Sequence, residues 1–305
     1  MQGQAPSAPG SSIEVEALFK SFEEVRAVQG ISFSVRQGEL FGFLGPNGAG
    51  KTTTINMLTG LARPDGGTIR IGGIDCSTNP KAAQHLIGVV PDESNLYPEL
   101  TGFHNLAFCG ALYGLRKELR EKRARELLER FGLDEAAHRA FSGYSKGMKR
   151  KLTIAAGIIH EPAILFLDEP TSGIDVASAR QIRQMISELN RRGTTIFLTT
   201  HYIEEAERLC DRIAFIVAGR LVRVESVQAL MEGHQEEQLM RFEVSGDGES
   251  LCRALTAAYP QLSCRAESQR SICVRSSQAI QVGPIVHVLE EAGAEIFEAR
   301  KLLPS

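Results

Sequence analysis

Hydrophobic residues follow two patterns along this chain that indicate β-strands. Residues 13–18 and 31–35 alternate between apolar and polar side chains, which predicts strands with one buried face. Other runs are apolar throughout, as in strands that are covered on both faces of a parallel sheet. These runs are residues 40–44, 86–90, 163–167 and 213–217, and two further strands are predicted at residues 68–71 and 194–199.

Segments with helical periodicity lie between these strands. Residues 119–131 place apolar side chains on one helical face and Arg and Glu side chains on the other. The apolar face consists of Ala124, Leu127, Leu128 and Phe131. Further helices are predicted at residues 53–58, 152–159, 177–191 and 203–210. Alternating strands and helices predict an α/β domain with helices on both faces of a parallel sheet, and residues 92–160 form a mostly helical insert.

The pattern changes after a polar stretch at residues 232–237, which is predicted to be a linker. Beyond it, strands and helices follow in the order β-α-β-β-α-β, which predicts a small α+β, ferredoxin-like module. The predicted domains are a disordered tail at 1–12, an α/β domain at 13–235 and a C-terminal module at 236–305. The expected core of the module is Phe242, Val244, Leu251, Leu255, Ile272, Val274, Ile285, Val288, Leu289, Ile296 and Phe297.

Composition narrows the class of protein. Of the 305 residues, 43% are hydrophobic and 23% are charged, as in soluble globular proteins. The net charge of −3 does not favour nucleic acid or anionic lipid as a partner. No apolar run approaches the length that spans a bilayer, and residues 1–12 lack the features of a signal peptide. The six cysteines form no CxxC pair, and we expect free thiols in a reducing cytosol, with neither zinc nor disulfides.

Residues Gly45–Thr53 have the G-x-x-x-x-G-K-[ST] pattern of a phosphate-binding loop. The loop lies between the strand 40–44 and the helix 53–58, where the positive end of the helix dipole favours phosphate. Its glycines let backbone N–H groups approach an anion closely. Lys51 is placed to reach the β- and γ-phosphates of a nucleotide, and Thr52 offers a hydroxyl to Mg²⁺. The stretch therefore predicts nucleotide binding.

Two carboxylates, Asp168 and Glu169, follow the buried strand 163–167. Alone they could be surface acids at the start of a loop, but after a P-loop they predict catalysis. Asp168 stands where such an enzyme needs a Mg²⁺-associated carboxylate, and Glu169 can orient or deprotonate the attacking water. His201 follows the strand 194–199, at the same edge of the sheet, and could hydrogen-bond the γ-phosphate. The alternative for His201 is a structural histidine.

A second anion site is predicted at Ser145 and Gly147, which precede the helix 152–159. Ser145 is a favourable N-cap residue, and a helix N-terminus attracts anions. The alternative is an ordinary cap beside a solvated basic patch. Within one molecule, a single nucleotide does not obviously need two phosphate sites.

Together these motifs resemble the ATP-binding subunit of an ABC transporter, and most closely its type-2 exporter branch, which serves drug and sodium efflux. The resemblance covers about residues 13–235 at the level of motifs, and the C-terminal module is also similar to this branch. Gly45–Thr53 matches the Walker A motif, Ile164–Asp168 matches Walker B, and Ser172–Asp175 matches the D-loop. The implied fold is a P-loop NTPase core with a helical subdomain.

The resemblance also implies roles for individual residues. Glu169, His201 and Lys51 are expected to be catalytic, and Thr52 and Asp168 to hold Mg²⁺. Residues expected to contact ATP are Phe22 (on the adenine), Gly45, Pro46, Asn47, Gly48, Ala49, Gly50, Lys51, Thr52, Thr53, Asp175 and, from a second copy, Ser145 and Gly147.

This chain departs from the family pattern at two motifs. Tyr144–Met148 reads Tyr-Ser-Lys-Gly-Met where the usual signature is Leu-Ser-Gly-Gly-Gln, a variant that is familiar in the exporter branch. The glutamine of the Q-loop aligns with Asp92, which is acceptor-only when ionised but could still hold Mg²⁺ or its water.

By resemblance, two copies sandwich two ATP molecules head to tail, and hydrolysis drives separate transmembrane permease subunits. The loop and helix after Asp92, with Leu96, Tyr97 and Phe103, are expected to dock a coupling helix of the permease, and the alternative for these apolar residues is internal packing. The chain would then lie in the cytoplasm, peripheral on the inner face of the cell membrane, without a nucleic-acid partner. Two alternatives stay open: a soluble ABC ATPase of translation or DNA maintenance, and a non-catalytic nucleotide-binding module.

Overall fold

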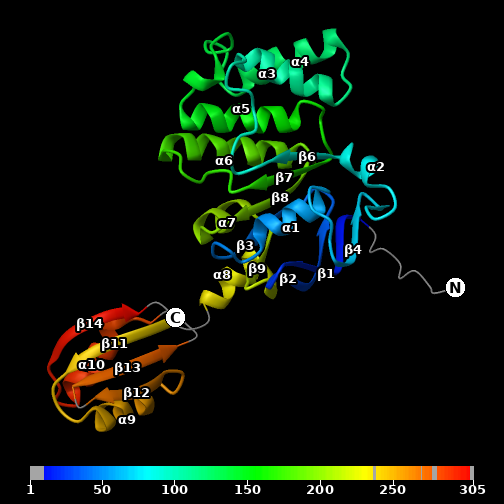
Figure 1. The fold of residues 1–305 in the computed structure, drawn as a ribbon. Helices are drawn as coiled ribbons and strands as arrows, with labels where there is room; N and C mark the ends of the chain where they lie inside the picture. The colour runs from blue at the N-terminus through cyan, green and yellow to red at the C-terminus, as the bar shows by residue number, and fades with distance from the viewer. Residues whose placement is uncertain (1–9, 236–237, 269, 277–279, 303–305) are drawn as a thin grey trace. The chain divides into compact units, whose positions relative to one another are not determined.

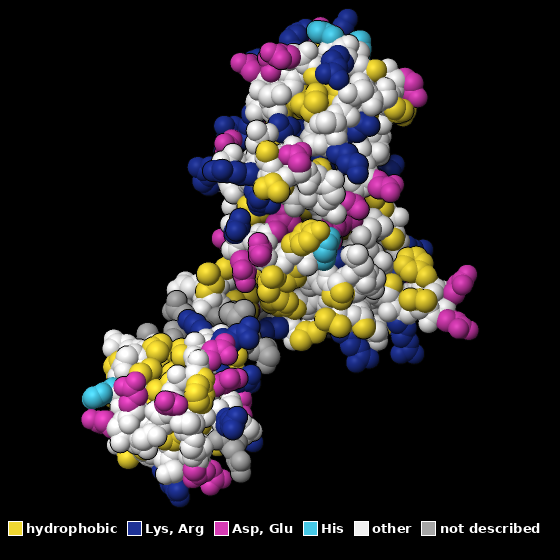
Figure 2. All heavy atoms as spheres, turned by 90° about the vertical axis from the view of Figure 1, so that its left-hand side faces the viewer, with side chains coloured by type: hydrophobic (Ala, Val, Ile, Leu, Met, Phe, Trp, Pro, Cys, Tyr) yellow, Lys and Arg dark blue, Asp and Glu magenta, His cyan; other side chains and the backbone are white. Residues whose placement is uncertain are grey.

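The computed structural model describes residues 10–235, 238–268, 270–276 and 280–302 (Figure 1). The chain divides into two compact units, Met1–Val227 and Gln228–Ser305, and each is described by itself below. Within the described residues, no helix is both long enough and apolar enough to cross a membrane. On the face drawn in Figure 2, Lys and Arg side chains are scattered among Asp and Glu side chains and small apolar patches.

The first unit is built on a six-stranded sheet in the order β10-β9-β3-β8-β7-β6. Five strands are parallel, and β10 pairs with β9 in the antiparallel direction. The strands are β3 (Leu40–Leu44), β6 (Ile87–Val90), β7 (Ile164–Asp168), β8 (Thr195–Thr200), β9 (Arg212–Val217) and β10 (Arg220–Ser226). All side chains of β3 and β7 are buried, so the apolar runs at 40–44 and 163–167 correctly predicted strands that are covered on both faces, and the side chains of β8 are buried as well.

A second, antiparallel sheet has the order β2-β1-β4-β5. Its strands are β1 (Ser11–Phe22), β2 (Val25–Arg36), β4 (Gly66–Ile71) and β5 (Ile74–Asp75). The two sheets share one hydrophobic core in which the rings of Phe33, Phe41, Phe43 and Phe197 lie 5.4–5.9 Å apart, centre to centre. The predicted disordered tail is wrong for Ser11 and Ser12, because β1 begins there and the Ser12 hydroxyl bonds that of Thr195 at 3.2 Å. Residues 1–9 of that tail lie outside the described residues.

Helices α1 (Lys51–Leu58), α2 (Pro80–Gln84), α6 (Val176–Arg191) and α7 (Ile203–Leu209) connect the strands. The predicted helical insert contains α3 (Gly102–Leu112), α4 (Lys117–Arg130), a 3₁₀ turn η1 (Phe141–Gly143) and α5 (Lys146–Ile158). In Figure 1 these helices lie together, beyond α6 as seen from the sheet. The predicted apolar face of α4 is confirmed, since Ala124, Leu128 and the C-cap residue Phe131 are buried.

The second unit has the predicted β-α-β-β-α-β order, with the ferredoxin-like strand order β12-β13-β11-β14. It contains β11 (Gln238–Val244), α9 (Gly248–Ala258), β12 (Ser263–Ser268), β13 (Ser271–Ser276), α10 (Val282–Glu291) and β14 (Ile296–Leu302). The predicted core is confirmed except for Phe297, which is 64% exposed. Successive side chains of a strand point to opposite faces, and in β14 the inward position belongs to Ile296.

Two further predictions about the C-terminal region are wrong. The expected linker at 232–237 is helical as far as Gln235, because α8 spans Val227–Gln235, while residues 236 and 237 lie outside the described residues. The expectation of free thiols fails for Cys252 and Cys264, which form a disulfide. Cys252 lies on the buried face of α9, and Cys264 lies on β12, which packs beside this helix. The Cα atoms of the two cysteines are 5.1 Å apart.

Candidate active site

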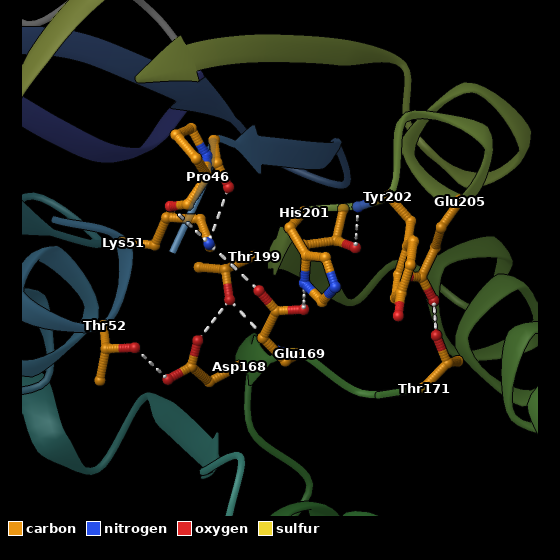
Figure 3. Close-up of polar contacts among 12 residues, drawn as sticks. Pro46, Lys51, Thr52, Asp168, Glu169, Thr171, Thr199, His201, Tyr202 and Glu205 are labelled. Atoms are coloured by element: carbon orange, nitrogen blue, oxygen red, sulfur yellow. Dashed lines mark hydrogen bonds and ion pairs between the residues drawn. The ribbon is translucent and has the colours of Figure 1, made fainter. Parts of the chain in front are cut away.

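The phosphate-binding loop connects β3 to α1, and its backbone conformation needs glycine. Gly48 and Gly50 have φ angles of 79° and 103°, a region that residues with a side chain rarely adopt. A Cβ atom on Gly50 would also lie 2.4 Å from the carbonyl oxygen of Ala27. Lys51 turns back over the loop, where its Nζ donates hydrogen bonds to the carbonyls of Gly45 at 2.8 Å and Pro46 at 3.2 Å (Figure 3).

Asp168 is held from both sides at the end of β7. The hydroxyl of Thr52 donates to Asp168 Oδ2 at 2.9 Å, and the hydroxyl of Thr199 donates to Oδ1. Hydroxyl and carboxylate oxygens are ligands that Mg²⁺ prefers, and this ion commonly completes its shell with substrate phosphates and water. Within the described part of the chain, no three His, Cys, Asp or Glu side chains converge as a metal site by themselves. The donor set therefore fits a nucleotide-bound Mg²⁺ better than a metal held by protein alone.

Glu169 lies between a lysine and a histidine. Its Oε1 is 3.2 Å from Lys51 Nζ, and its Oε2 is 2.8 Å from His201 Nδ1 (Figure 3). The backbone of Glu169 has a φ angle of 47°, and its N–H donates to the carbonyl of Thr199 at 3.1 Å. A non-glycine residue in the left-handed region at a functional site is a strained conformation that the surroundings must maintain. The geometry thus presents a fixed carboxylate next to the phosphate-binding loop.

A cavity of about 720 Å³ opens in front of these groups. Of the residues predicted to bind nucleotide or metal or to act in catalysis, those that line it are Asn47, Gly48, Gly50, Lys51, Thr52, Thr53, Asp92, Glu169 and His201. The sequence interpretation missed the lining residues Glu24, Val25, Arg26, Ala27, Gln29 and Ala218, and it gave Ser172 only as part of the D-loop motif. Phe22 does not line the cavity; its ring is 50% exposed and lies 5.2 Å from Lys20 Nζ.

Asp92 reaches the cavity from the loop after β6. Burial raises the pKa of its carboxyl group, the positive charge of Arg150 lowers that pKa, and the negative charges of Asp168 and Glu169 raise it further. Asp92 thus shares one electrostatic environment with both carboxylates of the site, as its predicted place near Mg²⁺ requires. Its role as a ligand stays a prediction.

Ser145, Gly147 and Asp175 do not line this cavity. The Ser145 hydroxyl accepts the N–H of Met148 at 3.2 Å and caps α5, as the sequence predicted. Asp175 caps α6 by accepting the N–H of Ser178 at 2.9 Å. Hydrogen bonds from the backbone and the side chain of Ser178 lower the pKa of Asp175. A Cβ atom on Gly147 would lie 2.3 Å from the Ser178 hydroxyl, so glycine lets the two helix starts meet. The three residues form a separate surface at the N-terminal ends of α5 and α6.

Comparisons with known proteins agree with this geometry. The sequence profile of the ABC transporter family matches residues 28–172. The linearmycin resistance ATP-binding protein LnrL of Bacillus subtilis is 42% identical over 243 residues, which are 80% of this chain and 78% of that protein. The daunorubicin/doxorubicin resistance ATP-binding protein DrrA of Streptomyces peucetius is 44% identical over 70% of this chain and 65% of its own length.

Solved structures show the same similarity. The structure of an ATP-binding subunit of an ABC transporter has a TM-score of 0.66 and 30% identity, covering 72% of this chain and 92% of that one. The ATP-binding cassette MJ0796, in a dimeric post-hydrolysis state with ADP and Pi, has a TM-score of 0.65 and 27% identity. It covers 70% of this chain and 98% of its own.

Proposed function

Because the chain belongs to the ATP-binding subunits of ABC transporters, we propose that it is the ATP-hydrolysing motor of an exporter whose membrane-spanning subunits are separate chains. The observation that carries this proposal is the position of Glu169 between Lys51 and His201, beside Asp168. Two relatives are named as resistance proteins for linearmycin and for daunorubicin/doxorubicin, which supports a role in export.

The residues in and beside the cavity have separate roles in hydrolysis. The backbone of the loop and Lys51 bind the phosphates, while Thr52, Asp168 and Asp92 would hold Mg²⁺, which neutralises phosphate charge when bound. Glu169 accepts a proton from the attacking water. A carboxylate oxygen only accepts hydrogen bonds, so Nδ1 of His201 donates to Glu169. A phosphate oxygen also only accepts, so Nε2 can bond the γ-phosphate only in a ring that carries a proton on both nitrogens.

A second copy of the chain completes each site. Ser145 and Gly147 stand at the N-terminus of α5, a helix of 13 residues, but do not line the cavity of their own chain. A capped helix start of this kind binds phosphate, and a head-to-tail dimer would bring it to the ATP of the partner. The dimeric structure of MJ0796 supports this arrangement.

The permease is proposed to dock near α3, which places the chain on the cytoplasmic face of the membrane. Tyr97 is 51% exposed and packs edge-on against the exposed ring of Phe108 at 5.2 Å, whereas Leu96 is buried and leaves the contact to the aromatic rings. Exposed aromatic side chains suit the apolar face of a partner helix.

Mixing inactive variants tests the head-to-tail dimer and the ATPase together. Lys51→Ala disables the phosphate loop of its own chain, and Ser145→Arg disables the site that its chain completes in the partner. Neither protein alone should hydrolyse ATP, but their mixture should form dimers with one complete site. Dimers without any ATPase activity at all mixing ratios would contradict the proposal, and co-purification with ribosomes or DNA in place of a membrane protein would contradict the export role.

A further inference from the structure

Arg150 is a buried arginine on α5 that donates hydrogen bonds to four backbone carbonyls. Its side chain is 7% exposed. Its Nε donates to Pro170 at 2.9 Å, its Nη1 donates to Asp92 at 3.0 Å and to Pro91, and its Nη2 donates to Asp168. The guanidinium group is planar and rigid, so these contacts fix the relative positions of the segments that they join.

Two of the carbonyls lie on either side of Glu169. Asp168 precedes it and Pro170 follows it, so one side chain holds both ends of the short segment that carries the catalytic carboxylate. Glu169 itself has the strained φ angle of 47°. Such a conformation persists only where neighbouring groups maintain it, and Arg150 supplies that constraint from the side of α5.

The other two carbonyls, of Pro91 and Asp92, belong to the loop after β6. Arg150 therefore ties this loop to the end of β7. Holding Arg150 in this position costs free energy, because burial disfavours its charged form and lowers its pKa. The negative charges of Asp92 and Asp168 raise this pKa but do not fully offset the effect of burial. Burying a charged group is costly even where acidic side chains lie nearby, so Arg150 is poorly explained by stability alone.

The same helix carries Ser145 at its N-cap, five residues before Arg150. In the proposed dimer, Ser145 meets the ATP of the partner while Arg150 holds the Glu169 of its own chain. We propose that Arg150 is a positioning residue that sets the orientation of Glu169 in its own chain, so that α5 connects the two ATP sites. This inference rests on the proposed function.

Arg150→Met should lower kcat by about 10²-fold, the loss that follows a misplacement of roughly 1 Å in a catalytic group. The Kd for ATP should not change, since the phosphate loop is intact. Arg150→Lys should restore little activity, because a single ammonium group cannot reach four carbonyls. Lys149→Met, which removes the neighbouring positive charge from the same helix, is the matched control and should keep kcat.

A double variant separates positioning from general stability. If Arg150 acts through Glu169, adding Arg150→Met to Glu169→Gln should not lower kcat further, because the group being positioned is already absent. A second loss that multiplies the first would mean that Arg150 acts elsewhere, and would overturn the proposal.

Mixed dimers locate the defect in one chain. Arg150→Met mixed with Ser145→Arg should recover ATPase activity, because the site on the Ser145→Arg chain has an intact Glu169 and an intact Ser145 from its partner. Arg150→Met mixed with Lys51→Ala should not recover, because each chain then spoils its own site. Should Arg150→Met fail to fold, Arg150→Lys gives the same test.

Any other pattern overturns the inference. If Arg150 only shaped the start of α5, the two mixtures would behave in the opposite way, since the defect would lie in the site of the partner. The mixture of Lys51→Ala with Ser145→Arg serves as the reference. If that reference fails, the head-to-tail dimer is wrong; if it recovers and the Arg150 mixtures deviate, only the role of Arg150 is wrong.

Discussion

At the scale of single residues, the most direct prediction concerns the role of Glu169 in ATP hydrolysis. Its carboxylate is 3.2 Å from Lys51 Nζ and 2.8 Å from His201 Nδ1. Glu169→Gln keeps the shape but loses the base, so hydrolysis should fall by about 10²-fold or more while ATP binding persists. Nucleotide affinity and single-turnover hydrolysis check this. Hydrolysis at nearly the wild-type rate would show that another group activates the water.

His160 should make stability depend on pH. Its Nε2 lies 2.9 Å from the carbonyl of Ile87, and its ring stacks on Tyr113 at 3.5 Å. Its buried Nδ1 has no hydrogen-bond partner among the residues that the structure describes. A carbonyl only accepts, so Nε2 carries the proton of the neutral ring, and a second proton on Nδ1 would be unpartnered. Burial accordingly lowers the pKa of His160 below its ordinary value.

The sign of this effect follows from proton counting. Below the ordinary value of about 6.5 the unfolded chain binds a proton that the folded chain does not, so the free energy of unfolding falls as pH decreases. His160→Gln retains a donor for Ile87 but does not titrate. Urea unfolding should show a smaller loss of stability for His160→Gln than for the wild type between about pH 8 and about pH 5. Equal losses would exclude His160 as the cause.

The sequence predicted the active-site residues that belong to a local motif. Lys51, Thr52, Asp168, Glu169 and His201 converge as expected. Asp168 ends β7, Glu169 and His201 directly follow β7 and β8, and Lys51 and Thr52 begin α1 after the loop that follows β3. Thr199 and Arg150 were not predicted. The contact of Thr199 with Asp168 depends on the register of β8 against β7, and the contacts of Arg150 depend on how α5 is rotated, and neither quantity is local in sequence.

At the scale of elements, β6 and α5 pack closely where Gly88 of β6 faces Gly157 of α5. A Cβ atom on Gly88 would lie 2.1 Å from the carbonyl oxygen of Gly157, which is backbone and cannot rotate away. Gly88→Ala should therefore lower the free energy of unfolding by about 1–3 kcal/mol, the range for an overpacked core. Denaturant unfolding measures this, with Gly143→Ala as the control, since the nearest atom there is 3.8 Å away. Equal stability of the two variants would mean that α5 can shift at little cost.

Most elements were predictable because their patterns are long and regular, and the exceptions have specific causes. β10 carries charged residues at Arg220, Arg223 and Glu225, since it is an exposed antiparallel edge strand and lacks the apolar run of its neighbours. The sequence predicted no disulfide, because the cysteines form no CxxC pair and a reducing cytosol was expected, but Cys252 and Cys264 are bonded. Their disulfide joins α9 to β12 across the fold, which spacing does not reveal.

At the scale of the whole molecule, the two units have separate cores. The core shared by the two sheets of the first unit draws on residues between Ile13 and Ile216, and that of the second on residues between Met240 and Ala294. Every residue assigned to ATP or Mg²⁺ precedes Asp211. Removing the second unit should therefore leave neither a hole in the first core nor a gap in the ATP site.

A chain that ends at Gln235 keeps α8 but lacks the strands and the core of the second unit, and it should bind ATP with the affinity of the full chain. We expect its dimer to be less populated, since a module of this size is only marginally stable alone and gains from contact with a partner. Calorimetry with ATP in the Glu169→Gln background measures affinity, and sedimentation measures the dimer. A full-length control with Phe297→Ser, at an exposed position of β14, tests whether local change in the module has the same effect. A large loss of affinity in folded, monomeric truncated protein would show that the module helps to build the ATP site, against the separation of the two cores.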